Sequence, residues 1–254
     1  MISFDTHAPR DVLLRAVSNS RLFRGLDRAF VEALVPHASI YRLAQGDCLW
    51  RRGTRADHFH TVIRGILDLQ RASTTGESTL IALFGPGESP GIPVTLEQRT
   101  FIADARATTP VLEVLRVRAE PILAAFPTDP ALAAAMVRAV LDHCALIHSK
   151  VDVLVAGTIS RRLASFMLNL ADRFGDEALD GTTFVPVALS RAQYATYVGA
   201  RVETVIRVCS AWQKDGLLTT QKDGFTLRSL DELRAVLAAP KPPAEGPGAF
   251  EDLG

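Results

Sequence analysis

Two charged side chains near residue 200 have the types and the spacing needed to read a base pair. Glu203 and Arg207 are four residues apart, so on a helix they would share one face. Arginine is the common bidentate partner of guanine, and glutamate can accept a hydrogen bond from N4 of the cytosine on the opposite strand. The bland alternative is an exposed ion pair worth roughly 0.2–0.5 kcal/mol, which carries no sequence information. The choice depends on the elements that hold the pair.

The chain around this pair predicts a helix-turn-helix. Ser190 can cap a short helix, Gly199 supplies a turn at low steric cost, and a second amphipathic helix begins near Val202. The positions that such a helix pair must keep apolar hold Tyr194, Ala195, Val198, Ala200, Val205 and Val208. In this motif the start of the second helix enters the major groove, which favours base contact for the charged pair.

A β wing is predicted to follow the second helix. Two short β-prone runs between residues 216 and 227 flank Asp223-Gly224, which is a hairpin signal. Lys222 is available there for phosphate contacts, which position a protein without specifying sequence; a solvated hairpin with no DNA role is the alternative. The candidate DNA-binding residues are Ser190, Arg191, Arg201, Val202, Glu203, Ile206, Arg207 and Lys222.

Charge is balanced over the whole chain but not within this segment. Lysine plus arginine and aspartate plus glutamate number 28 each, so the formal net charge is zero. Residues 190–214, however, carry Arg191, Arg201, Arg207 and Lys214 against Glu203 alone. A neutral protein with one basic face suits salt-sensitive, site-specific binding to double-stranded DNA better than general coating of nucleic acid.

The three cysteines form no metal or redox motif. Cys48, Cys144 and Cys209 are far apart, with no CxxC pair, and we expect them to be buried thiols. The N-terminus shows no signal segment, and no apolar run reaches the roughly 18 residues that span a bilayer. We therefore expect a cytoplasmic protein without a membrane partner.

The order of helical and β-prone segments along the chain predicts an α+β protein. Residues 1–36 look helical in two pieces, and short β-prone runs separated by glycines follow, the clearest being 66–71, 78–84, 101–107 and 111–117. Many short strands indicate a jelly-roll-like β roll. The expected parts are a β-roll effector domain over 1–128, a dimerisation helix over 129–157, a winged helix-turn-helix domain over 158–239 with an acidic loop over 176–184, and a disordered tail over 240–254.

The predicted long helix carries the pattern of a two-stranded coiled coil. Its apolar residues repeat with alternating spacings of four and three residues, and Leu132, Met136 and Leu146 form a second apolar side that can pack on the β roll. One helix with two apolar faces is easier to satisfy in a dimer; a single helix packed on its own core is the alternative. The candidate dimer interface consists of Val137, Val140, Cys144, Ile147, Val151 and Leu154.

This order of parts, over about residues 20–236, resembles the Crp/Fnr superfamily of bacterial transcription regulators. The segment Gly199-Ala-Arg-Val-Glu-Thr-Val-Ile-Arg is similar to the family's recognition helix, Gly-x-x-(Arg/Val)-Glu-Thr-x-x-Arg. Asp57 to Gly65 and Phe84-Gly-Pro-Gly-Glu are similar to a strand and a glycine-rich turn of its cyclic-nucleotide-binding-like domain. The resemblance implies a homodimeric, sequence-specific DNA-binding regulator of palindromic sites, and not an enzyme.

The same resemblance implies roles for single residues. Glu203 and Arg207 would read bases, and Val202 would lie beside a thymine methyl group. Family members with valine before the glutamate prefer TTGA-like half-sites, although Ile206 stands where those members often carry serine. An effector in the β roll would change the pose of the two recognition helices, and activation would require RNA polymerase as a further partner.

The effector cassette departs from the pattern of cyclic-AMP binders, which carry Gly-Glu for the ribose and Arg-Ser or Arg-Thr for the cyclic phosphate. Gly91 is followed by Ile92, so the carboxylate is missing, while Arg99-Thr100 remains as a phosphate site or a solvated loop. The candidate effector-binding residues are therefore Gly91, Arg99 and Thr100; we expect no resident cofactor, an effector of unknown identity, and not cyclic AMP. Residues 1–47 contain no cysteine, which excludes the iron–sulfur version of the family.

Three other functions remain open. The run from Gly53 to His60 resembles the first metal motif of cupins, which are metal enzymes, but no glutamate follows nearby and the next histidine is His143. A haem-dependent sensor on the same scaffold would use His58, His60 or Cys48 as an axial ligand. The third function is that of a pure interaction protein with a silent helix-turn-helix.

Overall fold

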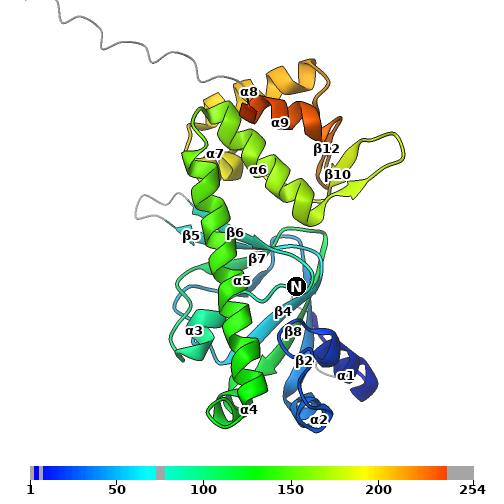
Figure 1. The fold of residues 1–254 in the computed structure, drawn as a ribbon, viewed down its shortest axis with the longest axis vertical. Coiled ribbons are helices and arrows are strands. Elements are labelled where there is room, and N and C mark those ends of the chain that lie inside the picture. Colours follow the sequence, from blue (N-terminus) through cyan, green and yellow to red (C-terminus); the bar gives the residue numbers. More distant parts are fainter. Residues whose placement is uncertain (1–2, 6–7, 73–77, 239–254) are drawn as a thin grey trace, which may run out of the picture.

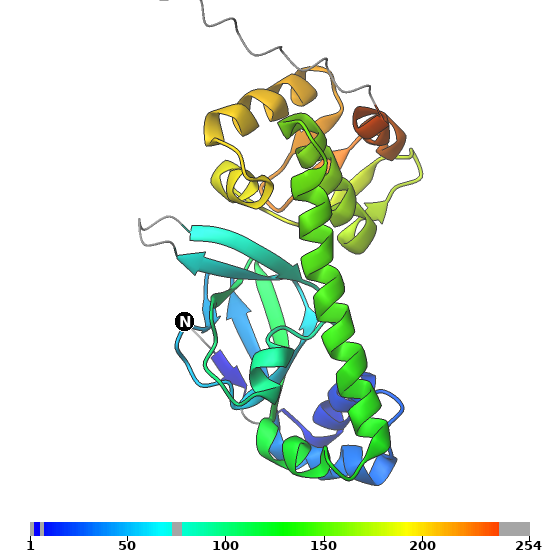
Figure 2. The same cartoon turned by 60° about the vertical axis from the view of Figure 1, so that its left-hand side comes forward.

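The computed structural model describes residues 3–5, 8–72 and 78–238, and it has a β-rich lobe and a helical lobe joined by one long helix (Figure 1). That helix, α5 (Pro130–Val155), runs along the β-rich lobe and reaches the helical lobe, as the turned view also shows (Figure 2). The predicted α+β architecture is confirmed. The predicted tail over 240–254 lies outside the described residues.

The β-rich lobe is a roll of two four-stranded sheets whose neighbouring strands are antiparallel. The orders are β1-β2-β8-β4 in the first sheet and β3-β7-β5-β6 in the second. The strands are β1 (Ser3–Asp5), β2 (Ala38–Ala44), β3 (Cys48–Trp50), β4 (His58–Arg64), β5 (Leu67–Ala72), β6 (Ser78–Phe84), β7 (Asp104–Ala107) and β8 (Val111–Arg118). Apolar side chains of both sheets form the core between them.

Helices cover the outer face of the first sheet. Phe59, Leu115 and Val117 of that sheet share an apolar cluster with them, whereas Leu112 and Val114 of β8 belong to the core of the roll. Because neighbouring side chains of a strand point to opposite faces, β8 is buried on both sides. The covering elements are α1 (Arg10–Asn19), α2 (Arg28–Leu34), the 3-10 helix η1 (Val35–His37) and α4 (Ala119–Ala125).

The long helix α5 begins and ends close to the predicted bounds. Asp129 caps it by accepting hydrogen bonds from the backbone N–H groups of Ala131 and Leu132, at 2.9 and 3.0 Å. Within the described part of the chain, α5 is the one helix long and apolar enough to cross a membrane by length and composition, which differs from our expectation that no stretch would qualify. The same test is passed by helices of soluble proteins, so it does not by itself indicate a membrane span.

The helical lobe holds the predicted helix-turn-helix and wing. Its apolar cluster joins all four helices and the small sheet, with Phe166, Leu170, Tyr194, Val205 and Leu233 among its buried members. The small sheet has the order β11-β12-β10-β9. The elements are α6 (Ile159–Phe174), β9 (Asp176–Glu177), β10 (Thr183–Val185), α7 (Arg191–Val198), α8 (Val202–Lys214), β11 (Leu218–Thr220), β12 (Phe225–Leu227) and α9 (Leu230–Ala238).

Some elements differ from the sequence-based prediction. The acidic stretch over 176–184, predicted as a loop, includes the short strand β9 and the start of β10, which pair with each other. The strand predicted over 101–107 begins only at Asp104, and β1, in a region predicted as helical, pairs with β2. These differences arise from strand pairing between distant segments, which local periodicity does not reveal.

Candidate nucleic-acid interface

The two helices of the motif are positioned by a capping box and a left-handed glycine. Ser190 Oγ accepts a hydrogen bond from the Gln193 backbone N–H, and Gln193 Oε1 accepts one from the Ser190 backbone N–H, at 3.2 and 2.9 Å. Gly199 ends α7 with φ of 63°, a conformation that favours glycine. Ala195 is buried where the helices approach each other, so this part of the prediction is confirmed.

The start of α8 presents the predicted reading face to solvent. Arg201, Glu203 and Arg207 are exposed, and Ile206 is 46% exposed. Among the described residues, no ion pair or hydrogen bond engages the side chains of Glu203 or Arg207, although the spacing would allow them to pair. Val202 is half-buried and packs against the apolar cluster of the lobe. The charged pair is therefore available to a ligand.

Arg191 and the wing form a second part of this surface. Arg191 Nη2 donates a hydrogen bond of 2.9 Å to Thr220 Oγ1 on β11, which ties α7 to the wing. Lys222 is exposed at the wing's turn, where the Gln221 backbone N–H donates to the Gly224 carbonyl oxygen at 2.8 Å. The oxygen of Ser190 is used in the cap. The hydroxyl of Ser190 thus serves the helix, while Lys222 is exposed and makes no ion pair with a described residue.

The cassette around Gly91 is filled by aromatic rings. Gly91, with φ of 79°, precedes α3 (Ile92–Leu96), and a Cβ there would lie 2.8 Å from the ring of Phe101. Phe101 stacks on Trp50 with ring centroids 4.1 Å apart, and both are buried. The cassette therefore presents apolar surface in place of polar groups for a sugar or a phosphate.

The structure places Arg99 and Thr100 at the surface, as the solvated-loop alternative expects, and their role in effector binding stays a prediction. The Arg99 side chain is 77% exposed and pairs with Glu97 at 2.8 Å, and Thr100 is exposed. Arg99 precedes Thr100, which forms an isolated β-bridge with Arg55. The arginine is consequently a solvated surface residue.

The exposed apolar strip of α5 differs from the predicted seam at two positions, each shifted by one residue. Val137, Cys144 and Val151 are exposed in the single chain, whereas Val140 packs on the apolar cluster of the covering helices. The expectation that all three cysteines are buried thiols is therefore wrong for Cys144, and it is confirmed for Cys209. Leu154 lies against Gly199, 3.4 Å from the Cβ position there. Leu141 and Val155 are 61% and 72% exposed in their place. The strip of exposed residues consists of Ala134, Val137, Leu141, Cys144, His148, Val151 and Val155, with Ile147 at its edge.

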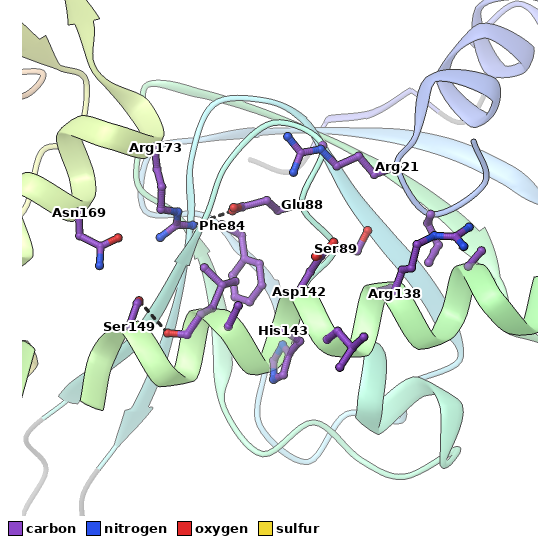
Figure 3. Close-up of a pocket in the computed structure, with 17 residues that line it drawn as sticks. Arg21, Phe84, Glu88, Ser89, Arg138, Asp142, His143, Ser149, Asn169 and Arg173 are labelled. Atoms are coloured by element: carbon purple, nitrogen blue, oxygen red, sulfur yellow. Dashed lines mark hydrogen bonds and ion pairs between the residues drawn. The ribbon is translucent and has the colours of Figure 1, made fainter. Parts of the chain in front are cut away.

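Polar contacts that the sequence did not suggest join the two lobes, in addition to the apolar contact that Ile66, Leu80 and Leu83 of the roll make with the cluster of the helical lobe. Arg173 of α6 pairs with Glu88 of the loop after β6 at 2.7 Å and donates to the Leu83 carbonyl oxygen at the same distance (Figure 3). Lys150 Nζ donates to the Leu80 carbonyl oxygen, and Thr196 Oγ1 accepts from the Leu80 N–H. A cavity of about 560 Å³ lies beside this junction, against α5.

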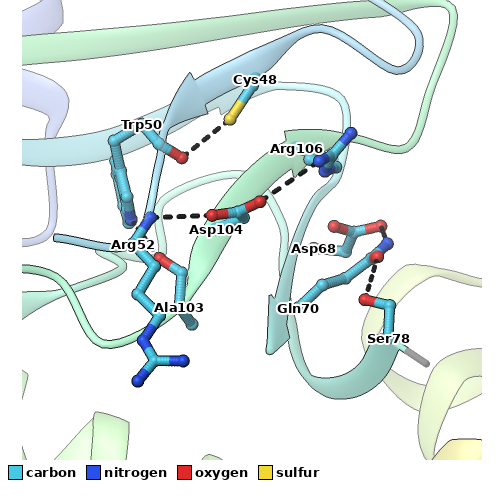
Figure 4. A network of polar contacts seen from close by, with 9 residues as sticks. All are labelled: Cys48, Trp50, Arg52, Asp68, Gln70, Ser78, Ala103, Asp104 and Arg106. Atoms are coloured by element: carbon cyan, nitrogen blue, oxygen red, sulfur yellow. Dashed lines mark hydrogen bonds and ion pairs between the residues drawn. The ribbon is translucent and has the colours of Figure 1, made fainter. Parts of the chain in front are cut away.

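A buried carboxylate also lies at this contact between the lobes. Asp68 of β5 accepts hydrogen bonds from Gln70, part of the polar network in Figure 4, and from Thr108, while the amide of Gln193 on α7 lies at 3.4 Å. Burial raises the pKa of Asp68 above its ordinary value. Gln193, the partner of Ser190 in the capping box of α7, thus lies within hydrogen-bond distance of the β-rich lobe.

The metal-based alternatives lack a suitable cluster. Within the described residues, no three histidine, cysteine, aspartate or glutamate side chains gather as metal ligands. The rings of His58 and His60 lie 6.3 Å apart, His58 Nδ1 lies 2.6 Å from Asp57 Oδ1, and Cys48 Sγ donates to the Trp50 carbonyl oxygen (Figure 4). His58 and Cys48 are engaged with protein groups, and within the described residues no third ligand joins the two histidines.

Comparison with known proteins agrees with this architecture. Residues 41–129 match the model of the cyclic nucleotide-binding domain, and residues 161–236 match that of the Crp-like helix-turn-helix domain. The transcriptional activator protein FnrA of Stutzerimonas stutzeri is 28% identical over 75% of this chain and 76% of its own. The nitrogen fixation regulation protein FixK of Azorhizobium caulinodans is 28% identical over 69% of this chain and 72% of its own.

Solved structures show the same fold. FixK2 from Bradyrhizobium japonicum superposes with a TM-score of 0.65 at 19% identity, over 78% of this chain and 96% of that one. A β roll, a long helix and a winged helix-turn-helix with an exposed reading face define a sensor-linked, DNA-binding regulator. The chain belongs to the Crp/Fnr family of transcription regulators.

Proposed function

We propose that this regulator acts as a homodimer that binds a two-fold symmetric, TTGA-like DNA site with one α8 in each of two successive major grooves. Glu203 and Arg207 read one G·C pair, Val202 lies beside a thymine methyl group, and Lys222 contacts phosphate. The observation that carries this proposal is the exposed, unpaired Glu203 and Arg207 at the start of α8.

The dimer forms along α5 in this proposal. An exposed strip with alternating spacings of three and four residues is the seam of a two-stranded coiled coil, and the strip of α5 from Ala134 to Val155 has these spacings. A parallel pair of helices would place the two α8 helices on the same side of the dimer. Two-fold symmetry of the protein then requires a palindromic site.

Regulation in this proposal does not use cyclic AMP, and the protein carries no resident cofactor. Filling of the cassette by Phe101 and Trp50, together with the solvent-facing Arg99, supports this view because a cyclic phosphate would find no charged partner there. The protein works in the cytoplasm without catalysing a reaction, and activation would bring it into contact with RNA polymerase.

Selection of bound sequences from a random DNA pool tests the proposal with the full-length chain. We expect an enriched palindrome whose half-sites contain a G·C pair and lie about one helical turn, or about 10 base pairs, apart. A pool without enrichment would favour the silent helix-turn-helix. Enrichment of single half-sites would contradict the dimer alone.

A further inference from the structure

The connection between α5 and α6 determines where the recognition helix lies. Residues Ala156 to Thr158 join the end of α5 to the start of α6, and Gly157 among them has φ of 101°, a conformation that favours glycine. In a dimer that forms along α5, the direction of the chain after this connection sets the place of each α8 relative to the two-fold axis.

One arginine side chain joins this connection to the turn of the helix-turn-helix. Arg162 Nε donates a hydrogen bond of 3.0 Å to the Gly157 carbonyl oxygen, and its Nη1 donates one of 3.2 Å to the Val198 carbonyl oxygen. The Gly199 carbonyl oxygen lies 3.5 Å from the same Nη1. Val198 is the last residue of α7 and Gly199 is its C-cap, so a single guanidinium contacts both the α5–α6 connection and the turn that leads to α8.

The charge of Arg162 suits the end of α7 better than the helix to which the residue belongs. Arg162 lies in the first turn of α6, at the positive end of the helix dipole, where a cation is unfavourable. The last carbonyl groups of α7 have no N–H partner within that helix, and they form the negative end of its dipole. The contacts at the end of α7, and not the stability of α6, therefore explain an arginine at this position.

A residue of α5 packs on the same turn. The Cβ position of Gly199 lies 3.4 Å from Leu154 Cδ2 and 3.6 Å from Arg162 Nη1. Ala200 and then Arg201, the N-cap of α8, follow Gly199 directly. Because so little chain separates this turn from α8, a movement of the turn relative to α5 would also move α8.

We propose that Arg162 is a positioning residue for DNA recognition. It holds the turn before α8 in place relative to α5, and in the proposed dimer, on which this role rests, it thereby sets the separation of the two α8 helices without contacting DNA. A lysine replaces it only in part, because the donors of an ammonium group share one nitrogen, whereas Nε and Nη1 of the guanidinium reach acceptors on two segments.

Binding of the full-length chain to palindromes with different half-site spacings tests this role. The reference is the spacing that the wild type selects, and the other sites are about one base pair shorter or longer. In Arg162→Gln we expect affinity for the reference site to fall about tenfold and the affinities for all spacings to approach one another, because simultaneous contact with two half-sites requires a fixed separation. Arg162→Lys should show a smaller change of the same kind. Equal spacing preference in wild type and Arg162→Gln would overturn the proposal.

The salt dependence of binding separates positioning from direct contact with DNA. A phosphate contact contributes about 0.9 to the slope of log affinity against log salt concentration. We expect Arg162→Gln to keep the wild-type slope, and a slope reduced by about one per protomer would instead assign Arg162 a phosphate contact. Arg234→Gln, which removes an exposed arginine of α9 that pairs with Asp231, is the control and should keep both the slope and the spacing preference.

Hydrogen exchange without DNA tests the role even if the wild type selects no palindrome. Arg162→Gln should speed exchange at the Gly199 and Ala200 amides, which donate to the Ala195 carbonyl oxygen, while the Leu217 amide in the same lobe reports whether the variant is folded. If exchange at Leu217 also rises, Arg162→Lys takes the place of Arg162→Gln in every comparison. Wild-type exchange at Gly199 and Ala200 would refute the role of Arg162 whatever DNA the protein binds.

Discussion

The role of Glu203 and Arg207 depends on the structure that surrounds them. Glu203 and Arg207 could neutralise each other on an ordinary helix, with little effect on stability. On α8 both are exposed and unpaired within the described chain, at the helix end that approaches DNA in this motif. Because the two side chains do not pair with each other, they do not stabilise the helix, and their exposure favours the proposed contact with bases.

Replacing the arginine should weaken specific binding. We expect Arg207→Ala to reduce affinity for the selected site by about 1–3 kcal/mol and to relax preference at one base pair, because a bidentate contact to guanine is lost. Fluorescence anisotropy with the site and its single-base variants measures both effects. Lys214→Ala, at the far end of α8, is the control and should leave base preference unchanged. A variant Arg207→Ala with wild-type preference would remove Arg207 from the reading face.

Buried histidines make folding stability depend on pH. Burial lowers the pKa values of His58, His60 and His143 below their ordinary value of 6.5. Below about pH 6.5 the unfolded chain therefore binds more protons than the folded one, so this part of the stability is present above pH 6.5 and is lost as pH falls toward the folded pKa values.

Urea unfolding at pH 7.5, 6.5 and 5.5 measures this dependence. We expect the free energy of unfolding to fall between the upper and the lower pH, and to fall less steeply in His60→Gln, which keeps a polar side chain but cannot titrate. An equal slope in wild type and His60→Gln would show that His60 does not contribute.

At the scale of elements, α5 carries an apolar strip that no described part of the same chain covers. Its inner side packs on the roll through Leu132 and Met136, which are buried, and its outer side exposes Val137, Leu141 and Val151. Exposed apolar side chains at coiled-coil spacing gain most when a second copy buries them. This strip explains why α5 is apolar enough to meet the composition of a membrane helix.

A charge in this strip should separate the dimer. We expect Leu141→Glu to weaken self-association by more than tenfold, since burying a leucine contributes about 1.5–3 kcal/mol and a carboxylate in the seam adds a desolvation penalty. Sedimentation equilibrium measures the change. Asp142→Ala, next to it but outside the strip, is the matched control. Unchanged association of Leu141→Glu would exclude this face of α5 as the interface.

The capping box of α7 is a second feature of this scale. Ser190→Ala removes the side-chain acceptor for the Gln193 N–H, and we expect the free energy of unfolding to fall by about 1 kcal/mol. Ser190→Asp, which restores an acceptor at the helix N-terminus, should recover most of this loss. Urea unfolding followed by circular dichroism measures both, and equal stability of all three proteins would contradict the role of the cap.

Over the whole molecule, both an apolar contact and a few polar contacts set the position of the DNA-binding lobe on the roll. Helix α7 packs on β6 of the roll, and the pair Arg173–Glu88 joins α6 to the loop that precedes the effector cassette. A change in that loop would therefore reach α6, which packs against α7 and α8. Such contacts can be broken and remade at low cost, which suits a regulator with two arrangements.

Breaking this ion pair should loosen the two lobes. We expect Glu88→Gln to speed hydrogen exchange at the Leu80 amide and along the end of α6. The free energy of local opening should fall there by about 1–2 kcal/mol, because a charge-assisted hydrogen bond is lost. Glu120→Gln, which disrupts the exposed pair with Arg118, should leave exchange at these sites unchanged. Wild-type exchange in Glu88→Gln would show that the pair does not hold the lobes together.

Local chemistry alone determined the helix-turn-helix, its cap at Ser190, the turn at Gly199 and the length of α5. Each of these follows from side-chain periodicity or from a backbone preference within a few residues. The family resemblance follows from the same segments. These features were predictable because their causes lie close together in the chain.

Only the tertiary structure decided which groups meet over long distances. It placed Phe101 on Trp50 in the effector cassette, turned Arg99 to solvent, and selected Leu141 over Val140 for the outer strip of α5. It also brought Arg116 beside His58 and over the Tyr41 ring. Strand pairing and packing, summed over many distant residues, fix which face of each element is covered, and no local pattern encodes that sum.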